Sequence, residues 1–165
     1  HKAGLAHKTG NKALNKIVSV SELKSELKTG QRLLGMDPGT KTIGLALSDT
    51  MHIVATPVET LHRTKFKNDV ARIIEIVEKE NVGGFVIGWP INMDGSEGPR
   101  CQSVMAFARN LAEKIDLPQL LWDERLSTAA VERTLIEADS SRARRKQVVD
   151  KLAAAYILQG ALHAL

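Results

Sequence analysis

Residues 32–49 have the sequence RLLGMDPGTKTIGLALSD, and this stretch governs the interpretation of the whole chain. An apolar run ends in Asp37, a Pro-Gly-Thr turn follows, and a second apolar run returns. The pattern predicts a β-hairpin that carries one acidic group at the end of a buried strand. A carboxylate in such a place is costly unless it is paired or binds a metal. The other interpretation is that Asp37 only starts the turn, because Asp before Pro-Gly often does so.

Two further acidic sites lie far along the chain. Asp123 and Glu124 follow a short apolar run, and Asp150 borders the apolar face of the expected last helix. Successive strand residues point to opposite faces, so only one of Asp123 and Glu124 can face Asp37. We favour Glu124, whose longer side chain can reach a shared metal, and Asp123 is the alternative. Without a metal, Glu124 would be a solvated strand end paired with Arg125, and Asp150 an exposed helix residue.

Three carboxylates from three elements, Asp37, Glu124 and Asp150, together predict a divalent-metal site. Ligand sets made only of oxygen select Mg²⁺ or Mn²⁺ over zinc. Two such ions about 4 Å apart can activate water and stabilise the leaving oxygen at a phosphodiester. Other chemistries fit poorly. The five histidines show no zinc spacing, and the chain has neither a Gly-x-Ser-x-Gly elbow nor a Walker A loop.

The hydrophobic pattern predicts the order of the elements. Strands are expected at residues 32–37, 42–48, 53–61, 82–89 and 117–123, and helices at 19–30, 66–80, 100–115 and 146–162, with a further helix from Ser127. Pro57 should place the third strand at an edge or in a bulge. The core side of the last helix is expected to hold Val149, Leu152, Ala153, Tyr156 and Ile157. The result is an α/β fold with a five-stranded mixed sheet, a three-strand antiparallel meander plus two parallel strands, and helices on both faces.

Composition is that of an ordinary globular domain. The 165 residues are 43% hydrophobic and 25% charged, and this length and composition are typical of one globular domain. We expect that domain at residues 19–165, after a flexible basic segment at residues 1–18. The net charge of +4 suits a polyanionic partner. The one cysteine, Cys101, fits a reducing cytoplasm. No apolar stretch approaches the roughly 20 residues that span a bilayer, so no membrane partner is expected.

Several polar residues are candidates for contacts with a nucleic acid. The densest basic cluster precedes the last helix and is expected to be a mobile loop; beside a metal site it would contact phosphates, and otherwise it is a solvated loop. Asn92 lies in the loop after a buried strand, where it could touch substrate or stabilise the loop itself. Trp89 is interpreted as core packing. The candidates are Lys41, Asn92, Arg125, Arg142, Arg144, Arg145 and Lys146.

Four segments, 34–44, 86–95, 123–128 and 150–158, resemble in the same order the motifs of the YqgF family. This family is also called the RuvX or Holliday-junction-resolvase-like family and belongs to the RNase H-like superfamily. Position 89 is usually Leu in the family and is Trp here. In the wider superfamily an acidic residue often comes from the strand beside the first one. Here that strand ends at Gly88 and Trp89 without a carboxylate, so Glu124 must substitute for it.

The resemblance implies an RNase H-like fold, a metal-dependent nuclease and a cytoplasmic location. It also implies maturation of the 5′ end of the 16S rRNA precursor, with the pre-30S particle as a partner. Cleavage of Holliday junctions, a branched DNA, ranks second and would need a homodimer, whereas a monomer suffices to trim RNA. Two other interpretations remain open: a non-catalytic RNA- or ribosome-binding module, and an actin-like ATPase or sugar kinase. The last needs two such domains, and 165 residues supply one.

Overall fold

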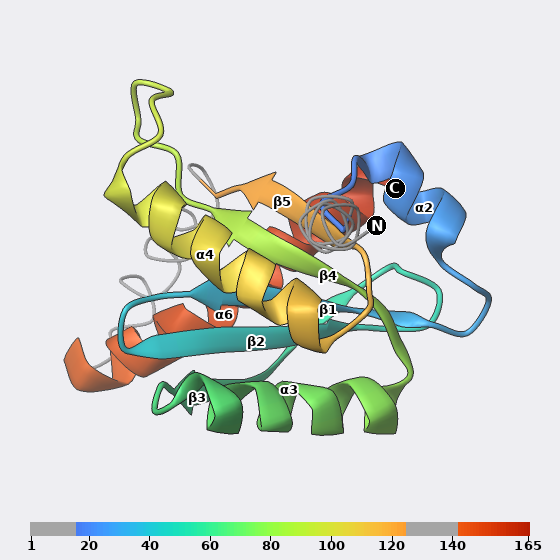
Figure 1. The fold of residues 1–165 in the computed structure, drawn as a ribbon, viewed down its shortest axis with the longest axis horizontal. Helices are drawn as coiled ribbons and strands as arrows, with labels where there is room; N and C mark the ends of the chain where they lie inside the picture. Colours follow the sequence, from blue (N-terminus) through green and yellow to red (C-terminus); the bar gives the residue numbers. More distant parts are fainter. Residues whose placement is uncertain (1–15, 125–141) are drawn as a thin grey trace, which may run out of the picture.

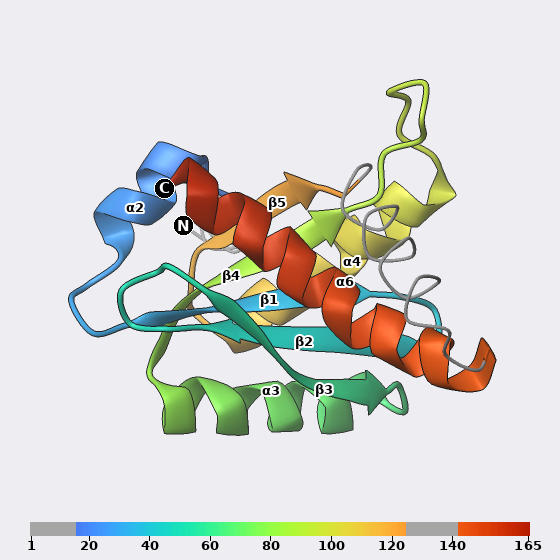
Figure 2. The ribbon, with the colours of Figure 1, turned by 180° about the vertical axis from the view of Figure 1, so that it is seen from behind.

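The computed structural model describes residues 16–124 and 142–165, and for residues 142–151 it describes the backbone alone. A five-stranded sheet forms the middle layer, with helices on both faces (Figures 1 and 2). The elements in chain order are α2 (Val20–Glu26), β1 (Arg32–Pro38), β2 (Thr42–Ser48), β3 (Ala55–His62), α3 (Phe66–Glu80), β4 (Val82–Trp89), α4 (Pro99–Lys114), β5 (Gln119–Asp123) and α6 (Arg142–Ala164).

The sheet has the predicted mixed topology, with the strand order β3-β2-β1-β4-β5. Strand β2 pairs antiparallel with both β1 and β3, whereas β4 pairs parallel with β1 and β5. The fold class is therefore confirmed. Strand β3 is an edge strand, and its register shifts where Ala46 pairs with Pro57 and Leu45 with Glu59. Both predicted consequences of Pro57, the edge position and the bulge, are present because proline cannot donate a ladder hydrogen bond.

Alternation along β1 assigns its side chains to two apolar layers. Leu34 and Met36 pack with helices α3 and α4, and Leu33 packs with α6 on the other face. Figure 2 shows α6 crossing the second face of the sheet, with α4 behind the sheet and α3 along its lower edge. Because the period of a strand is two, Asp37 continues the row of Leu33 and Gly35. The hairpin thus delivers its carboxylate to the α6 side of the sheet.

Helix α6 lies unusually close to β1 because Gly35 has no side chain. A Cβ built on Gly35 would lie 2.8 Å from the Cβ of Leu158 and 3.0 Å from the carbonyl oxygen of Ala154. The alanines of this helix face are fully or nearly buried. Small residues on both elements therefore set the distance at which α6 passes the end of β1.

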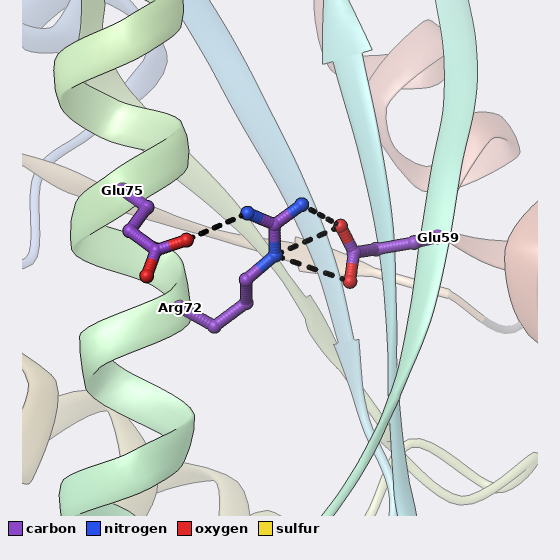
Figure 3. A network of polar contacts seen from close by, with 3 residues as sticks. All are labelled: Glu59, Arg72 and Glu75. Carbon is purple, nitrogen blue, oxygen red and sulfur yellow. Dashed lines mark hydrogen bonds and ion pairs between the residues drawn. The ribbon is translucent and has the colours of Figure 1, made fainter.

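A charged network fastens the opposite layer to the edge strand (Figure 3). Arg72 of α3 donates to both carboxylate oxygens of Glu59 on β3, and its Nη2 lies 2.5 Å from Glu59 Oε1. Its Nη1 also donates to Glu75 Oε2 at 2.9 Å. These bonds to Glu59 and Glu75 raise the pKa of the Arg72 guanidinium above its usual value.

The N-terminal region differs from the prediction in two details. Ser19 caps α2 with a reciprocal bond to Glu22, as its sequence suggests, but the helix ends at Glu26 and Leu27 is already extended. Gly30 instead supplies a positive φ of 87° in the turn before β1. The packed body begins before residue 19, because Ile17 forms a parallel bridge with Gln119 and Lys16 pairs with Asp116. Residues 1–15 lie outside the described residues.

The last helix also corrects the sequence interpretation. It begins at Arg142, so residues 142–146 form its first turns instead of a loop. Arg, Lys and Ala are strong helix formers, and this propensity outweighs the local charge density. Tyr156, expected in the core, is 39% exposed, whereas Ala154, Leu158 and Ala161 are fully buried. Residues 154, 158 and 161 share the helix face that meets the sheet, and residue 156 lies on the opposite side of the helix. The helix expected from Ser127 lies outside the described residues.

Smaller shifts affect α4, which starts at Pro99, and β5, which starts at Gln119. Trp89 is buried in the cluster beneath α4, which confirms its interpretation as core packing. Among the described residues, no helix is both long and apolar enough to cross a bilayer.

Candidate active site

Two of the predicted metal ligands meet near the end of strand β1. The carboxyl groups of Asp37 and Glu124 share a hydrogen bond. Asp37 comes from β1, and Glu124 directly follows β5, two strands away in the sheet. Strand β4 lies between them, so the side chain of Glu124 must cross the end of β4 to reach Asp37.

Gly88 of β4 provides the space for this crossing. A Cβ built on Gly88 would lie only 2.5 Å from Glu124 Oε2 and 2.7 Å from Ile157 Cδ1 of α6. The Glu124 carboxyl group therefore occupies the volume that any other side chain at position 88 would need. The sequence shows that β4 ends without a carboxylate, but this role of Gly88 was not predicted from it. The available signal was the glycine itself, at the end of a strand that is otherwise buried throughout.

Strand alternation separates Glu124 from Asp123. On β5, Leu121 packs on the α3 and α4 side, and Trp122 packs on the α6 side. Continuing the alternation places Asp123 on the first side and Glu124 on the second, where Asp37 lies. Glu124 is therefore the partner of Asp37 because it lies on the same face of the sheet. The sequence suggested the same residue only from the length of its side chain.

The environment of Glu124 opposes its ionisation. Its side chain is only 12% exposed, and burial followed by the nearby Asp37 charge raises its pKa to about 7. Arg100, at the start of α4, opposes this shift, but its Nη1 lies 3.9 Å from Glu124 Oε1 and is mostly solvent-exposed. Two adjacent carboxyl groups with little solvent and one distant cation form a donor set that fits a divalent metal ion. A bound cation would offset the repulsion between the two carboxylates.

The third predicted ligand, Asp150, lies in α6 one helical turn before Ala154. The carbonyl of Ala154 is the helix backbone group next to Gly35, so the Asp150 backbone belongs to the part of α6 near the end of β1. The side chain of Asp150 is outside the described part of the structure. Among side chains within it, no three acidic, histidine or cysteine residues form a metal cluster.

The family model described as "RuvX: Holliday junction resolvase" matches residues 31–164. The chain belongs to the RuvX family. A relative from Paramagnetospirillum magneticum, named "Putative pre-16S rRNA nuclease", is 60% identical over 146 residues, which are 88% of this chain and 94% of the relative. A relative of the same name from Zymomonas mobilis is 62% identical over 131 residues, covering 79% and 80% of the two chains.

Among solved structures, T. thermophilus RuvC in complex with a Holliday junction substrate superposes with a TM-score of 0.52. The match covers 81% of this chain and 94% of RuvC at 16% identity. At that identity the likeness shows the fold alone, and it agrees with the RNase H-like arrangement predicted from the sequence.

Of the residues predicted to contact nucleic acid in this RuvX-family chain, the side chains of Lys41 and Asn92 are described. Lys41 is exposed in the β1–β2 turn. Asn92 stands in a loop that projects away from the sheet (Figure 1), where its amide donates to Ser96 Oγ at 3.0 Å. That bond favours the loop-stabilising interpretation of Asn92. Arg125 lies outside the described residues, as do the side chains of the basic residues at 142, 144, 145 and 146, whose backbone is helical.

Arg100 was not identified from the sequence as part of the site. It follows Pro99, the first residue of α4, after the long loop that leaves β4. Helices in this fold begin near the ends of the strands they follow. A basic residue at the start of such a helix, like Arg100, could therefore have been predicted to lie near the carboxyl pair. Arg100 is the described cation that ion-pairs with the Asp37–Glu124 pair.

Proposed function

We propose that this protein is a metal-dependent nuclease that matures the 5′ end of the small-subunit rRNA precursor. The observation that carries the proposal is the Asp37–Glu124 carboxyl pair, assembled over Gly88 near the end of β1. The relatives named as pre-16S rRNA nucleases are 60% and 62% identical to this chain over the aligned residues and support the choice of RNA. The single cysteine suits a reducing cytoplasm, where the pre-30S particle would present the substrate.

Asp37 and Glu124, joined by Asp150 from α6, would hold Mg²⁺ or Mn²⁺. Carboxylate oxygens are the ligands that these hard cations prefer. When bound, such an ion activates water for attack and stabilises charge at the phosphodiester.

The remaining residues have roles that do not depend on the ion. Gly88 keeps the path of Glu124 open, and Arg100 places positive charge beside the carboxyl pair. Lys41 and Asn92 would contact the substrate from the β1–β2 turn and the loop after β4. Arg125 and the basic residues of α6, Arg142, Arg144, Arg145 and Lys146, would neutralise backbone phosphates.

A second candidate is cleavage of four-way DNA junctions, which the description of the matching family model favours. A symmetric junction requires two coordinated cuts, so this activity predicts a homodimer, whereas a monomer suffices to cleave RNA. The substrate preference therefore has an independent readout in the oligomeric state.

The deciding experiment is a cleavage assay on a precursor-rRNA 5′ fragment and on a four-way DNA junction, each with Mg²⁺, Mn²⁺ or EDTA. Asp37→Asn and Glu124→Gln should each lower the cleavage rate by at least about 100-fold while the fold is kept. Asp123→Asn is the matched control, because it removes the neighbouring charge on the other face and should retain most activity.

RNA cleavage that needs both a divalent ion and Asp37 would support the proposal. Cleavage of the junction alone would favour the resolvase. Tight RNA binding with no cleavage in any divalent ion would instead identify a non-catalytic binding module. Full activity of Glu124→Gln would show that the carboxyl pair is not the active site.

A further inference from the structure

A cleft lies on the α3 and α4 side of the sheet, next to the turn that follows Asp37. It lies between the turn after Asp37, the start of α3 and residues 100–110 of α4. In Figure 1, α4 crosses in front of the sheet and α3 runs along its lower edge. The volume of the cleft is about 580 Å³, within the range of pockets that take small molecules or single groups of a larger ligand. Neither the sequence motifs nor the carboxyl site accounts for it.

The floor of the cleft holds an arginine in a fixed position. Phe66 and Phe107 meet edge to face, with ring centroids 6.2 Å apart. The guanidinium of Arg63 lies 5.5 Å from the centroid of the Phe107 ring, and its Nη1 donates to the carbonyl of Gly39 at 2.6 Å. A cation–π contact on one side and a backbone carbonyl on the other orient this side chain before any ligand binds.

Arg63 keeps most of its hydrogen-bonding capacity. Guanidinium has five N–H donors, and within the described residues Arg63 uses one of them and has no carboxylate partner. The contrast is with Arg32 and Arg72, which both pair with glutamates. An oriented arginine with free donors is suited to a phosphate, whose oxygens accept two parallel bonds.

The other residues that line the cleft also favour an anionic ligand. Arg100 supplies a second cation, and none of the described residues that line the cleft is acidic. Uncharged polar side chains complete the wall at Thr40, Thr64, Ser103 and Asn110. Two cations, neutral hydrogen-bonding groups and an aromatic floor form a surface for a phosphate with an attached sugar or base.

Arg100 also joins the cleft to the carboxyl site. It lines the cleft and lies 3.9 Å from Glu124, and Pro38 and Gly39, which directly follow Asp37, form another part of the wall. A polynucleotide with one phosphate at Asp37 and Glu124 would therefore meet this cleft next along its backbone.

We propose that this cleft binds one nucleotide of the substrate strand adjacent to the scissile phosphate, with its phosphate on Arg63 and its base or sugar against Phe66. The cleft would fix the register of the strand on the enzyme. This assignment rests on the proposed nuclease function, because it takes its ligand from the same strand.

The test compares two glutamate substitutions on neighbouring exposed positions of α4. Ser103→Glu adds a negative charge inside the cleft, whereas Gln102→Glu adds the same charge one residue away, outside it. Binding of a fluorescent single-stranded RNA is measured in EDTA over a range of salt concentrations, so that no cleavage is required.

Ser103→Glu should weaken binding by about tenfold and lower the slope of log K against log salt by about one, since one phosphate contact is lost. Gln102→Glu should stay within about twofold of wild type. Equal affinities of the two variants would overturn the proposal.

A second measurement uses adenosine 5′-monophosphate as a probe of the wild-type protein by NMR. Saturable shifts at the amides of Thr40, Thr64 and Ser103 are expected, and shifts confined to other surfaces would contradict the assignment.

The nuclease proposal and the cleft proposal can be refuted separately. Asp37-dependent cleavage with unchanged RNA binding by Ser103→Glu would refute only the cleft. Weakened binding by Ser103→Glu in a protein that never cleaves would refute only the nuclease.

Discussion

Two polar sites of the molecule differ in their charges. The Glu59–Arg72–Glu75 network pairs opposite charges, whereas the carboxyl pair near the end of β1 brings two acidic groups together. In the network, an arginine lies between two carboxylates at the protein surface, and their hydrogen bonds and charges raise the pKa of Arg72. At Asp37 and Glu124, two acids are brought together with little solvent, and the pKa of Glu124 rises to about 7. Folding tolerates this cost because the apolar layers around α6 stabilise the arrangement. Perturbed acids of this kind are typical of functional sites.

Gly88 should separate the two regions most sharply. Gly88→Ala places a Cβ 2.5 Å from Glu124 Oε2, so the carboxyl group must move away from Asp37. We expect cleavage to fall by about 100-fold, because displacements of about 1 Å in an active site have effects of this size. Cleavage of the rRNA fragment under single-turnover conditions measures the loss.

The matched control is Gly83→Ala at the other end of the same strand. Its Cβ would meet the side chain of Gln31, far from the carboxyl pair. This variant should lose stability without a specific loss of cleavage per folded molecule. If both alanine variants lose activity in proportion to stability alone, Gly88 has no special relation to the site.

The pH dependence of stability should reveal the cost of the carboxyl pair. In EDTA, folded Glu124 holds its proton up to about pH 7, whereas the unfolded chain releases it near the ordinary value of 4.5. The folded state therefore binds more protons between these values. Its free energy of unfolding should fall as pH rises through this window, by about 2–3 kcal/mol for the pair. Urea unfolding at a series of pH values measures the slope.

Glu124→Gln is the comparison that isolates this effect. Glutamine fills the same space over Gly88 without a titrating proton, so this part of the slope should disappear. An unchanged slope in the variant would assign the pH dependence to other groups.

The smallest effect is expected from the surface network. Arg72→Met removes the bonds to Glu59 and Glu75 and keeps most of the apolar length of the side chain. Exposed ion pairs contribute little, so stability should change by less than about 1 kcal/mol. Cleavage should be unchanged. Thermal unfolding at low and high salt measures the effect, which should shrink as salt screens the charges. A loss of several kcal/mol would mean that the network holds β3 in place.

Local patterns in the sequence were enough for most of the fold. The apolar runs on either side of the Pro-Gly-Thr turn predict β1 and β2, and α3 and β4 have the predicted bounds. These features depend on side-chain periods of two and 3.6 residues, which neighbouring residues determine. At residues 142–146 two local signals disagreed. The charge density suggested a loop, but the helix propensity of these residues favoured a helix, and the segment is helical.

The sequence by itself determined that Asp37 would stand near the end of a buried strand, and that a second carboxylate at residue 123 or 124 could join it. The tertiary structure decided which of the two meets Asp37, since that depends on the face of β5 and on the space over Gly88. It also decided that Arg63 and Arg100 border one cleft beside this site. Residues 63 and 100 are brought together by packing of α3 and α4 on the sheet, and no local period carries information about such a contact.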